Sequence, residues 1–312
     1  MARCSRPTPD PGSRCVTRLH NRTRTSESIP RKLLRQGKVH LLPIYALMRT
    51  SDLAREGIEN SASYRFADHV YRNQPNGRFG IGRALDAVLL RMRAARSMRN
   101  RFHHTQREIL AAARALASRS TMDPVAVTAP FRVLSIPSGI ARDLVLAGQA
   151  VERELPEVYA RSTFFGVDLD PAPVELSRDL AGRDDHYFFT HGDALDATCF
   201  PSELDVITST GLGEFLSDEL LVQFYRNCHA RLRPGGTLVT SSMQPDRVAD
   251  YLMRQLAELH THYRRGDEII RWLHVAGFHQ VSARQDDVGL QTLIVARRVE
   301  RRRVARDKSS ST

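Results

Sequence analysis

Short apolar segments alternate with polar turns over the middle of the chain. They cover residues 131–136, 163–168 and 186–190. Continuous apolar runs of this length, bounded by turn residues, are typical of strands buried in a parallel sheet. Asp170 and Pro171 follow the second run and predict a helix start, because Asp is a good N-cap and proline suits the first helical position. This alternation of strands and helices predicts half of a doubly wound sheet.

The same alternation continues towards the C-terminus. We expect a fourth strand over 204–209, a helix over 217–232 and a fifth strand over 237–241. Two further helices and a closing pair of strands are predicted over 245–262, 267–276, 278–284 and 291–297. The C-terminal half therefore belongs to the same α/β layer architecture.

Two helices are predicted before the sheet, over 83–99 and 104–119. On the first, apolar residues share one face and arginines extend a basic side: Leu85, Val88, Leu89 and Met92 against Arg91, Arg93, Arg96 and Arg99. Three interpretations of this basic helix stay open: a cap packed on the sheet, a surface for acidic partners or nucleic acid, and contact with an anionic membrane. The polar and aromatic segment 51–79 is interpreted either as a lining of a substrate cavity or as polar surface between helices.

Four motifs occur in order along the predicted sheet. Gly139 lies in the turn after the first strand, Asp168 ends the second strand, Gly192-Asp193-Ala194 follows the third, and Pro234-Gly235-Gly236 precedes the fifth. These motifs resemble the S-adenosylmethionine (SAM) site of class I methyltransferases, and the likeness extends to about Arg297.

The first motif departs from the family's usual pattern of an acid, a hydrophobe and Gly-x-Gly-x-Gly. Only the central glycine, Gly139, is kept, while Ser135, Pro137 and Ala141 occupy the places of the acid and of the two other glycines. This degenerate motif, together with segment 51–79, resembles a bacterial group of class I methyltransferases.

The resemblance implies a fold and a cofactor. The fold is α/β, a Rossmann-like, seven-stranded, doubly wound sheet with an N-terminal helical cap, and the cofactor is SAM. Gly139 is expected near the methionine part, Asp168 at the ribose hydroxyls, Asp193 at the adenine amino group, and Ser135 at the ammonium group. The implied cofactor-binding set also includes Pro137, Ser138, Leu169, Ala194 and Thr210. The alternative for Asp168 and Asp193 is that they only cap strand ends.

Charge is distributed unevenly over the 312 residues. The net charge is +11, but residues 1–120 carry 24 Lys and Arg against 8 Asp and Glu, whereas residues 121–296 carry 15 against 25. We expect a disordered basic tail over 1–38, a helical cap and substrate region over 39–120, a SAM-binding domain over 121–297 and a basic tail over 298–312.

Several other classes of protein do not fit the sequence. Positions two and five residues after Gly139 hold Ala141 and Leu144, so a dinucleotide-binding glycine motif is absent. No phosphate loop, Gly-x-Ser-x-Gly elbow or His-Glu-x-x-His helix occurs. The cysteines have no metal-ligand spacing, so we expect no metal site. No apolar run is long enough to span a membrane and no secretory signal is visible, so we expect a cytoplasmic protein.

Methyl transfer needs a positioned nucleophile and, for a hydroxyl or amine acceptor, a general base. Glu214, His191 and Tyr225 are the candidates near the strand ends, although Tyr225 also fits a core position and His191 the border of the adenine pocket. The loop 210–218 resembles that of methyltransferases that make fatty-acid methyl esters. We therefore expect methyl transfer to a small-molecule or lipid acceptor. The alternative is a non-catalytic SAM-fold protein whose basic flanks bind nucleic acid or an anionic membrane.

Overall fold

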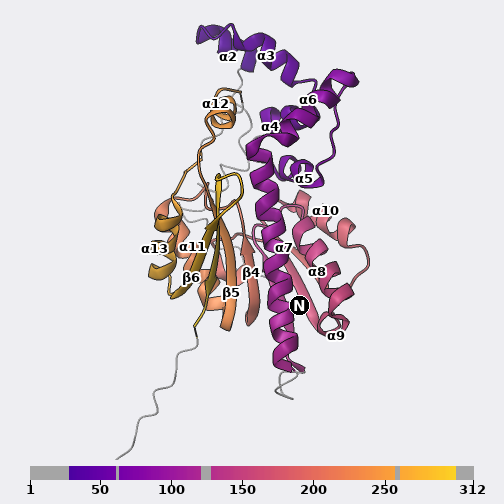
Figure 1. The fold of residues 1–312 in the computed structure, drawn as a ribbon, viewed down its shortest axis with the longest axis vertical. Coiled ribbons are helices and arrows are strands. Elements are labelled where there is room, and N and C mark those ends of the chain that lie inside the picture. The colour runs from indigo at the N-terminus through magenta and orange to yellow at the C-terminus, as the bar shows by residue number, and fades with distance from the viewer. Residues whose placement is uncertain (1–27, 61–62, 121–127, 257–260, 300–312) are drawn as a thin grey trace, which may run out of the picture.

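The fold is built around one mixed sheet of seven strands, shown in Figure 1. The computed structural model describes residues 28–60, 63–120, 128–256 and 261–299. The strands are β1 (Phe131–Ser135), β2 (Ser162–Asp168), β3 (Tyr187–His191), β4 (Leu204–Ser209), β5 (Leu232–Met243), β6 (Gln280–Gln285) and β7 (Gln291–Arg297). Their order is β3-β2-β1-β4-β5-β7-β6, with β7 antiparallel to both neighbours. The predicted fold class, with seven strands and helices before the sheet, is confirmed.

Helices cover both faces of this sheet (Figure 1). α11 (Asp218–Arg231) and α13 (Gly266–Val275) cover one face, where Leu134 and Ile207 are buried. α8 (Arg142–Glu154), α9 (Pro156–Tyr159) and α10 (Pro171–Ala181) cover the other, where Val133 and Val206 are buried. Neighbouring strand residues thus point to opposite cores, as the strand period of two requires, and both faces of the central strands are dry.

The helix before the sheet serves two parts of the molecule. α7 (Arg93–Ser120) packs Ile109, Ala113 and Leu116 against the same core as Val133 and Val206. Its N-terminal half continues past the end of the sheet to the cap, as Figure 1 shows. With 28 residues it is about 42 Å long. The region predicted as a helical cap and substrate region therefore also covers one face of the sheet.

The expected break between the two N-terminal helices is misplaced. α6 (Phe79–Arg91) ends at Met92, whose backbone is extended, and α7 then runs without interruption through the expected gap at 100–103. That gap contains neither glycine nor proline, so nothing local ends the helix there. The real break is stabilised by tertiary contact, since the Arg99 guanidinium donates to the Leu90 carbonyl at 2.8 Å.

The arginines of α7 bind the sheet edge. Arg93 donates to the Val288 carbonyl at 2.6 Å, and Arg96 donates to the Asp287 carboxylate at 2.9 Å, both in the turn between β6 and β7. Of the three interpretations of the basic helix, these contacts support cap packing for the α7 part.

Four more helices complete the cap: α2 (Ile29–Arg35), α3 (Leu41–Met48), α4 (Asp52–Glu59) and α5 (Tyr64–Arg72). The expectation of disorder up to residue 38 is wrong for α2, where Ile29 and Leu33 are buried against Leu41, Ile58 and Leu256. Ile29 and Leu33 lie one helical turn apart, a spacing that predicts a helix with one buried face. The basic and polar composition of residues 1–38 as a whole does not reveal this local pattern. Residues 1–27 lie outside the described residues.

The predicted C-terminal tail also begins too early. The Arg298 backbone N–H donates to the Gly236 carbonyl at 2.9 Å, and the Arg298 carbonyl accepts from Gly235 at 2.7 Å. Arg298 therefore extends the pairing of β7 with β5. Residues 300–312 lie outside the described part of the chain.

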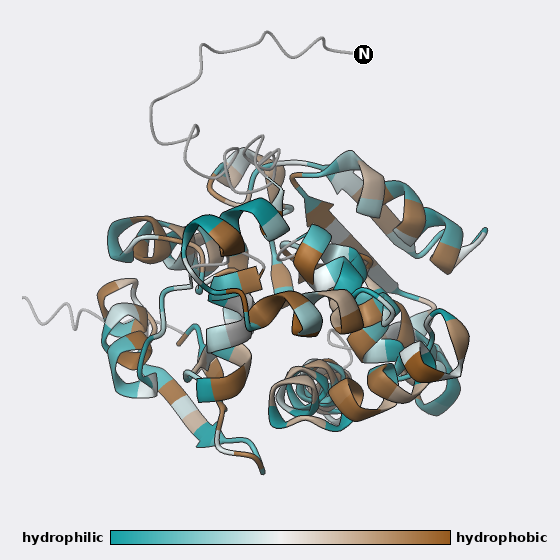
Figure 2. Cartoon of the chain, turned by 90° about the horizontal axis from the view of Figure 1, so that it is seen from above, coloured by the Kyte–Doolittle hydropathy of each residue, from teal (hydrophilic) through white to brown (hydrophobic). Residues whose placement is uncertain are grey.

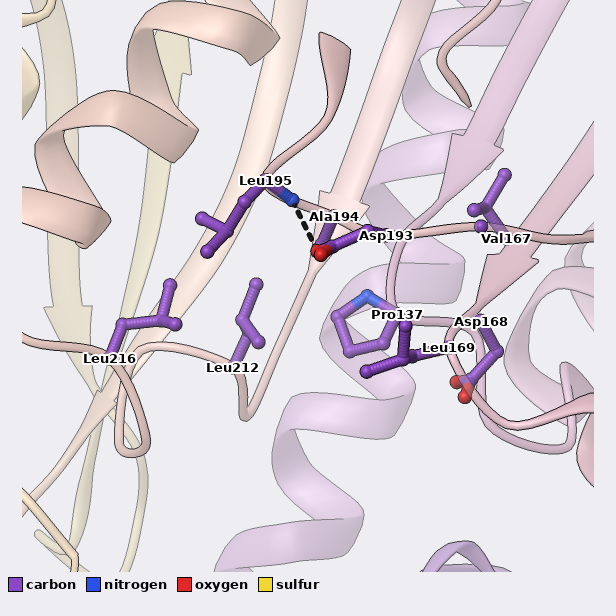
Figure 3. Close-up of a pocket in the computed structure, with 10 residues that line it drawn as sticks. Pro137, Val167, Asp168, Leu169, Asp193, Ala194, Leu195, Leu212 and Leu216 are labelled. Atoms are coloured by element: carbon purple, nitrogen blue, oxygen red, sulfur yellow. Dashed lines mark hydrogen bonds between the residues drawn. The ribbon is translucent and has the colours of Figure 1, made fainter. Parts of the chain in front are cut away.

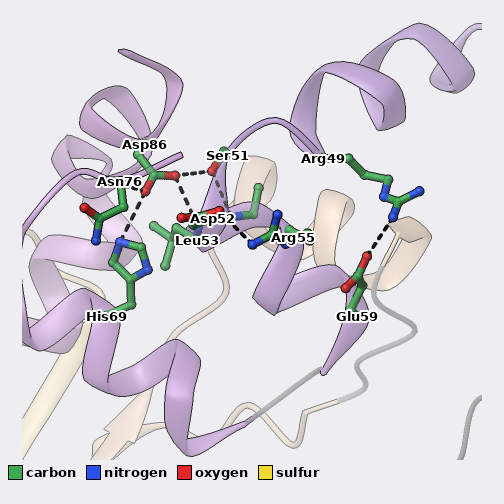
Figure 4. A network of polar contacts seen from close by, with 10 residues as sticks. Arg49, Ser51, Asp52, Leu53, Arg55, Glu59, His69, Asn76 and Asp86 are labelled. Atoms are coloured by element: carbon green, nitrogen blue, oxygen red, sulfur yellow. Dashed lines mark hydrogen bonds and ion pairs between the residues drawn. The ribbon is translucent and has the colours of Figure 1, made fainter. Parts of the chain in front are cut away.

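One buried carboxylate ties the cap helices together (Figure 4). Asp86 of α6 is fully buried and accepts hydrogen bonds from the Ser51 hydroxyl, from Leu53 N at 3.2 Å and from Asn76 N at 2.9 Å. The His69 ring lies 3.2 Å from its second oxygen. The network joins α4, α5 and α6, and backbone donors satisfy a charge that would otherwise be costly to bury.

Candidate functional site

The turn after β1 explains why one glycine of the first motif is kept. Gly139 has φ +52°, a left-handed conformation that favours glycine. Its N–H donates to the Asp168 carboxylate at 2.8 Å, and Ser138 N–H donates to the Val167 carbonyl at 2.9 Å. The turn is therefore fixed onto the end of β2, and this geometry needs glycine only at the central position.

Asp168 lies at the centre of this arrangement. Its side chain is 4% exposed, and its second oxygen accepts a hydrogen bond from Asp170 N at 3.0 Å. Asp170 in turn caps α10 by accepting from Ala172 N at 2.9 Å, as predicted. Asp168 thus combines a strand-end capping role with a position on the wall of a pocket.

This pocket opens beyond the carboxyl ends of the parallel strands, where open α/β sheets bind ligands (Figure 3). The empty space between its walls is about 380 Å³, part of it open to solvent. It is lined by Pro137, Val167, Asp168, Leu169, Gly192, Asp193, Ala194, Leu195, Leu212 and Leu216.

The pocket combines two carboxylates with apolar walls. Asp193 accepts a hydrogen bond from Leu195 N at 2.8 Å, marked in Figure 3, so it too is held by backbone. Leu195, Leu212 and Leu216 form the apolar side opposite Asp168 (Figure 3). Such a site suits a ligand with a flat apolar ring, several hydrogen-bond donors and a positive charge.

Five residues of the predicted cofactor set line this pocket: Pro137, Asp168, Leu169, Asp193 and Ala194. The other four, Ser135, Ser138, Gly139 and Thr210, lie next to it along the chain but are not among its lining residues. Ser135 and Ser138 are buried, and the Ser138 hydroxyl donates to the Gly139 carbonyl at 3.3 Å.

The three candidates for a general base occupy different environments. His191 is exposed at the end of β3, opposite Asp168 in the strand register. Tyr225 belongs to α11, is 1% exposed and packs in the core between that helix and the sheet. Burial raises the pKa of its hydroxyl. Glu214 is buried in the loop after β4, between the two pocket leucines of that loop. Only Glu214 combines burial with a position beside the pocket.

The loop that carries Glu214 is held by hydrogen bonds from the segment just before α13. Arg264 donates to the carbonyl groups of Gly213 and of Leu216, the latter at 2.6 Å, and pairs with Asp218 at 2.7 Å. The Glu214 carbonyl accepts from His262 N at 2.8 Å. Glu214 is therefore presented by a fixed backbone.

A cation from the cap faces this glutamate. Arg101 of α7 is 9% exposed; its Nη1 lies 4.0 Å from Glu214 Oε1, and its Nε donates to the Tyr71 hydroxyl at 3.3 Å. Burial raises the pKa of Glu214, and the positive charge of Arg101 acts against that shift. Burial also raises the pKa of Asp143, at the start of α8, to about 6, although Leu144 N donates to it at 3.0 Å.

Sequence reasoning missed Arg101 and Asp143. The sequence did contain a signal for Arg101. It lies one helical turn before Thr105 and two turns before Ile109, so the three residues share the buried face of α7. A charge at a position where the helical period predicts a core residue indicates a buried polar site.

Comparison with known proteins assigns the family. The sequence profile of a family described as "Putative methyltransferase" matches residues 37–298. The chain belongs to this family. A search of curated proteins finds no significant match.

One solved structure shares the fold of this chain over most of its length, and two methyltransferase structures are more distantly similar. A protein from Bordetella parapertussis, titled a possible exported protein, is 18% identical, with a TM-score of 0.68 and coverage of 93% of this chain and 98% of that one. The SAM-dependent methyltransferase SibL is 16% identical, with a TM-score of 0.47 and coverage of 88% and 78%. A structure titled a putative O-methyltransferase from Nostoc punctiforme is 19% identical, with a TM-score of 0.42 and coverage of 61% and 60%.

The cap of this family member covers the first turn of the site. Asp68 of α5 pairs with Arg142 of α8 at 2.6 Å and with Arg72 at 3.1 Å. A Cβ placed on Gly139 would lie 3.6 Å from the Tyr64 side chain. Segment 51–79, for which cavity lining and polar surface were both open, thus supplies Tyr64, Asp68 and Tyr71 to the layer above the strand ends.

Proposed function

We propose that this chain binds SAM in the pocket beyond β1, β2 and β4 and transfers its methyl group to a small-molecule or lipid acceptor. The observation that carries the proposal is the pair of backbone-held carboxylates, Asp168 and Asp193, on the walls of one otherwise apolar pocket. Within the described residues no group of three or more His, Cys, Asp or Glu could hold a metal ion.

The residues fit the chemistry of this cofactor. Backbone N–H groups orient both carboxylate oxygens of Asp168, and a carboxylate accepts several hydrogen bonds, so it suits the ribose hydroxyls. In this proposal Asp193 accepts from the adenine amino group, and Leu195, Leu212 and Leu216 form the surface for the ring. Two carboxylates also complement a positively charged cofactor.

The bound cofactor supplies an activated methyl group on a sulfonium sulfur. The chain contributes position and exclusion of water. Tyr64 of α5 lies near Gly139 in the turn after β1, Arg101 of α7 lies against Gly211 after β4, and the loop after β4 holds Leu212 and Leu216 against the pocket. Alignment of an acceptor for in-line displacement is worth several orders of magnitude in rate without any covalent step on the protein.

Titration calorimetry with SAM and with S-adenosylhomocysteine, its demethylated product, tests the proposal. We expect both to bind the full chain, and we expect labelled methyl groups to appear in an acceptor. No heat with either compound at millimolar concentration would overturn the proposal. Binding without transfer to any acceptor would favour the alternative, a non-catalytic binding protein.

A second candidate function concerns the outer face of the cap, which lies nearest the viewer in Figure 2. Large apolar side chains are exposed on α2, α3 and α6 and between α2 and α3: Leu34, Val39, Ile44, Leu47, Phe79, Ile81 and Val88. Phe79 is 85% exposed at a positive φ of 59°. No Asp or Glu occurs over 28–50, and the one over 77–92, Asp86, is buried, whereas Arg78 and Arg83 are exposed.

We propose that this face contacts an anionic membrane surface, because exposed apolar groups among cations without exposed carboxylates complement lipid headgroups and acyl chains. None of the described helices is long and apolar enough to cross a bilayer. The contact proposed here is therefore peripheral.

Co-sedimentation with vesicles tests the membrane contact. We expect binding to vesicles that contain phosphatidylglycerol, less binding to pure phosphatidylcholine, and loss of binding in a Phe79→Ser, Ile81→Ser variant. Val275→Ser, at an exposed apolar position on α13, is the matched control and should bind as the wild type does. A dimer in size-exclusion chromatography that only the double variant disrupts would instead assign this face to a second copy.

A further inference from the structure

The carboxyl group of Glu214 is buried without full hydrogen bonding. The residue is 5% exposed, and its Oε1 has no hydrogen-bond partner within the part of the chain that the structure describes. The nearest cation, Arg101 Nη1, is 4.0 Å away, which is beyond hydrogen-bond distance. Buried polar atoms are nearly always hydrogen-bonded, so a buried carboxylate oxygen that lacks a hydrogen bond, on the loop beside the cofactor pocket, points to a ligand that completes it.

Glu214 lies on the same loop as the cofactor pocket. Leu212 and Leu216, two residues away on either side, line that pocket, so their Cα atoms are at most about 7.6 Å from that of Glu214. Gly211 lies against the Arg101 guanidinium, where an added Cβ would be 3.1 Å from Nη1. The same loop therefore lines the cofactor pocket with Leu212 and Leu216 and contacts Arg101 with Gly211 and Glu214.

The charges around the pair select among acceptors. Arg101 faces Glu214 and, from α8, Asp143, while Arg264, whose charge also acts on Glu214, pairs with Asp218. Tyr71 and Tyr225 approach from α5 and α11. A carboxylate acceptor would meet two carboxyl groups, and a protonated amine would meet Arg101. A neutral hydroxyl can donate to Glu214 and accept from Arg101.

Building on the proposed methyl transfer, we propose that Glu214 and Arg101 form the acceptor subsite, and that Glu214 takes the proton from an acceptor hydroxyl during transfer. The O–H bond breaks towards the carboxylate, an oxygen lone pair forms the new C–O bond, and the electron pair of the broken C–S bond stays on sulfur. Glu214 then returns its proton to water, so the products are a methyl ether and S-adenosylhomocysteine.

Two matched probe series test the selectivity with the full chain and radiolabelled SAM. One series is phenol, benzyl alcohol, benzylamine and benzoate; the other is 1-dodecanol, dodecylamine and dodecanoate. We expect a hydroxyl compound to be methylated at least tenfold faster than the amine and the carboxylate of its series. Faster transfer to a carboxylate or an amine overturns the proposal. So does the absence of transfer to every hydroxyl while S-adenosylhomocysteine binds.

Variants of Glu214 test its role. Glu214→Gln should lower kcat about 10²- to 10⁴-fold, the usual contribution of a general base, and abolish the rise of rate with pH. Glu214→Asp should keep part of the rate and the pH dependence, which a purely structural role would not give. Glu219→Gln, at an exposed position on the first turn of α11, is the matched control and should behave as the wild type does.

Binding of S-adenosylhomocysteine separates this proposal from the previous one. All three variants should bind it as the wild type does, since Glu214 does not line the cofactor pocket. Wild-type rate and pH profile in Glu214→Gln would remove Glu214 from the reaction and leave cofactor binding intact. Failure of the wild type to bind S-adenosylhomocysteine would overturn both proposals together.

Discussion

Asp168 and Asp170 are two residues apart and have separable roles. Asp168 accepts from the backbone of Gly139 and Asp170 and lines the pocket, whereas Asp170 caps α10 from the outside. Asp168→Ala should weaken S-adenosylhomocysteine binding at least tenfold, about 1.4 kcal/mol, because the ribose hydroxyls lose their acceptor. It should also lower the free energy of unfolding by about 1–3 kcal/mol, because two N–H groups lose a buried partner.

Asp170→Ala is the control for this substitution. Loss of an N-cap costs about 1 kcal/mol of unfolding free energy and should leave cofactor affinity nearly unchanged. Calorimetric titration and urea denaturation of both variants measure the two effects. Exchanged phenotypes would contradict the strand register on which the site is built.

At the scale of elements, α2 is the sharpest departure from what composition predicts. Ile29 and Leu33 are 7% and 1% exposed in a cluster with Leu41, Ile58 and Leu256. A chain that begins at His40 should lose the burial of both, about 1.5–3 kcal/mol for each side chain, and should melt several degrees lower. A chain that begins at Ser28 is the control. Equal melting temperatures for the two truncated chains would show that α2 contributes nothing to stability.

The strands were the most predictable elements. β4 and β7 have their expected bounds, since short apolar runs between turn residues leave few alternatives. The break at Met92 was not predictable, because it depends on Arg99, nine residues from the carbonyl that it binds. The pocket shows the same division. Asp168 ends β2 and Asp193 follows β3, each in a motif that the sequence displays. Leu212 and Leu216, by contrast, reach the pocket only through the path of a loop that Arg264 holds.

At the scale of the whole molecule, His104 links the cap helix to the sheet edge and makes stability depend on pH. Burial, and then the charges of Arg284 and Arg107, lower the pKa of His104 to about 4, and Arg284 lies 3.2 Å from its Nδ1, with Glu108 at 3.5 Å. The neutral ring is favoured in the folded state. Between about pH 6.5 and 4 the unfolded chain therefore binds more protons, so stability falls as the pH is lowered through this window.

Urea denaturation at pH 7.5 and pH 5 measures the effect. The wild type should lose about 1–3 kcal/mol of unfolding free energy over this interval through His104. His104→Gln should lose less over the same interval, whatever its stability at pH 7.5. An identical loss in both proteins would mean that other groups cause the pH dependence.

The length of α7 has a consequence for how such a protein can acquire new acceptors. The C-terminal half of the helix packs on one face of the sheet, and the N-terminal half presents Arg101 to Glu214. The cap and the sheet domain therefore share one uninterrupted helix. Exchange of the cap as a module would remove Ile109, Ala113 and Leu116 from the interior and expose the underlying strands. We therefore expect acceptor preference within this family to diverge by point substitutions along one face of α7, one helical turn at a time, rather than by exchange of the whole cap.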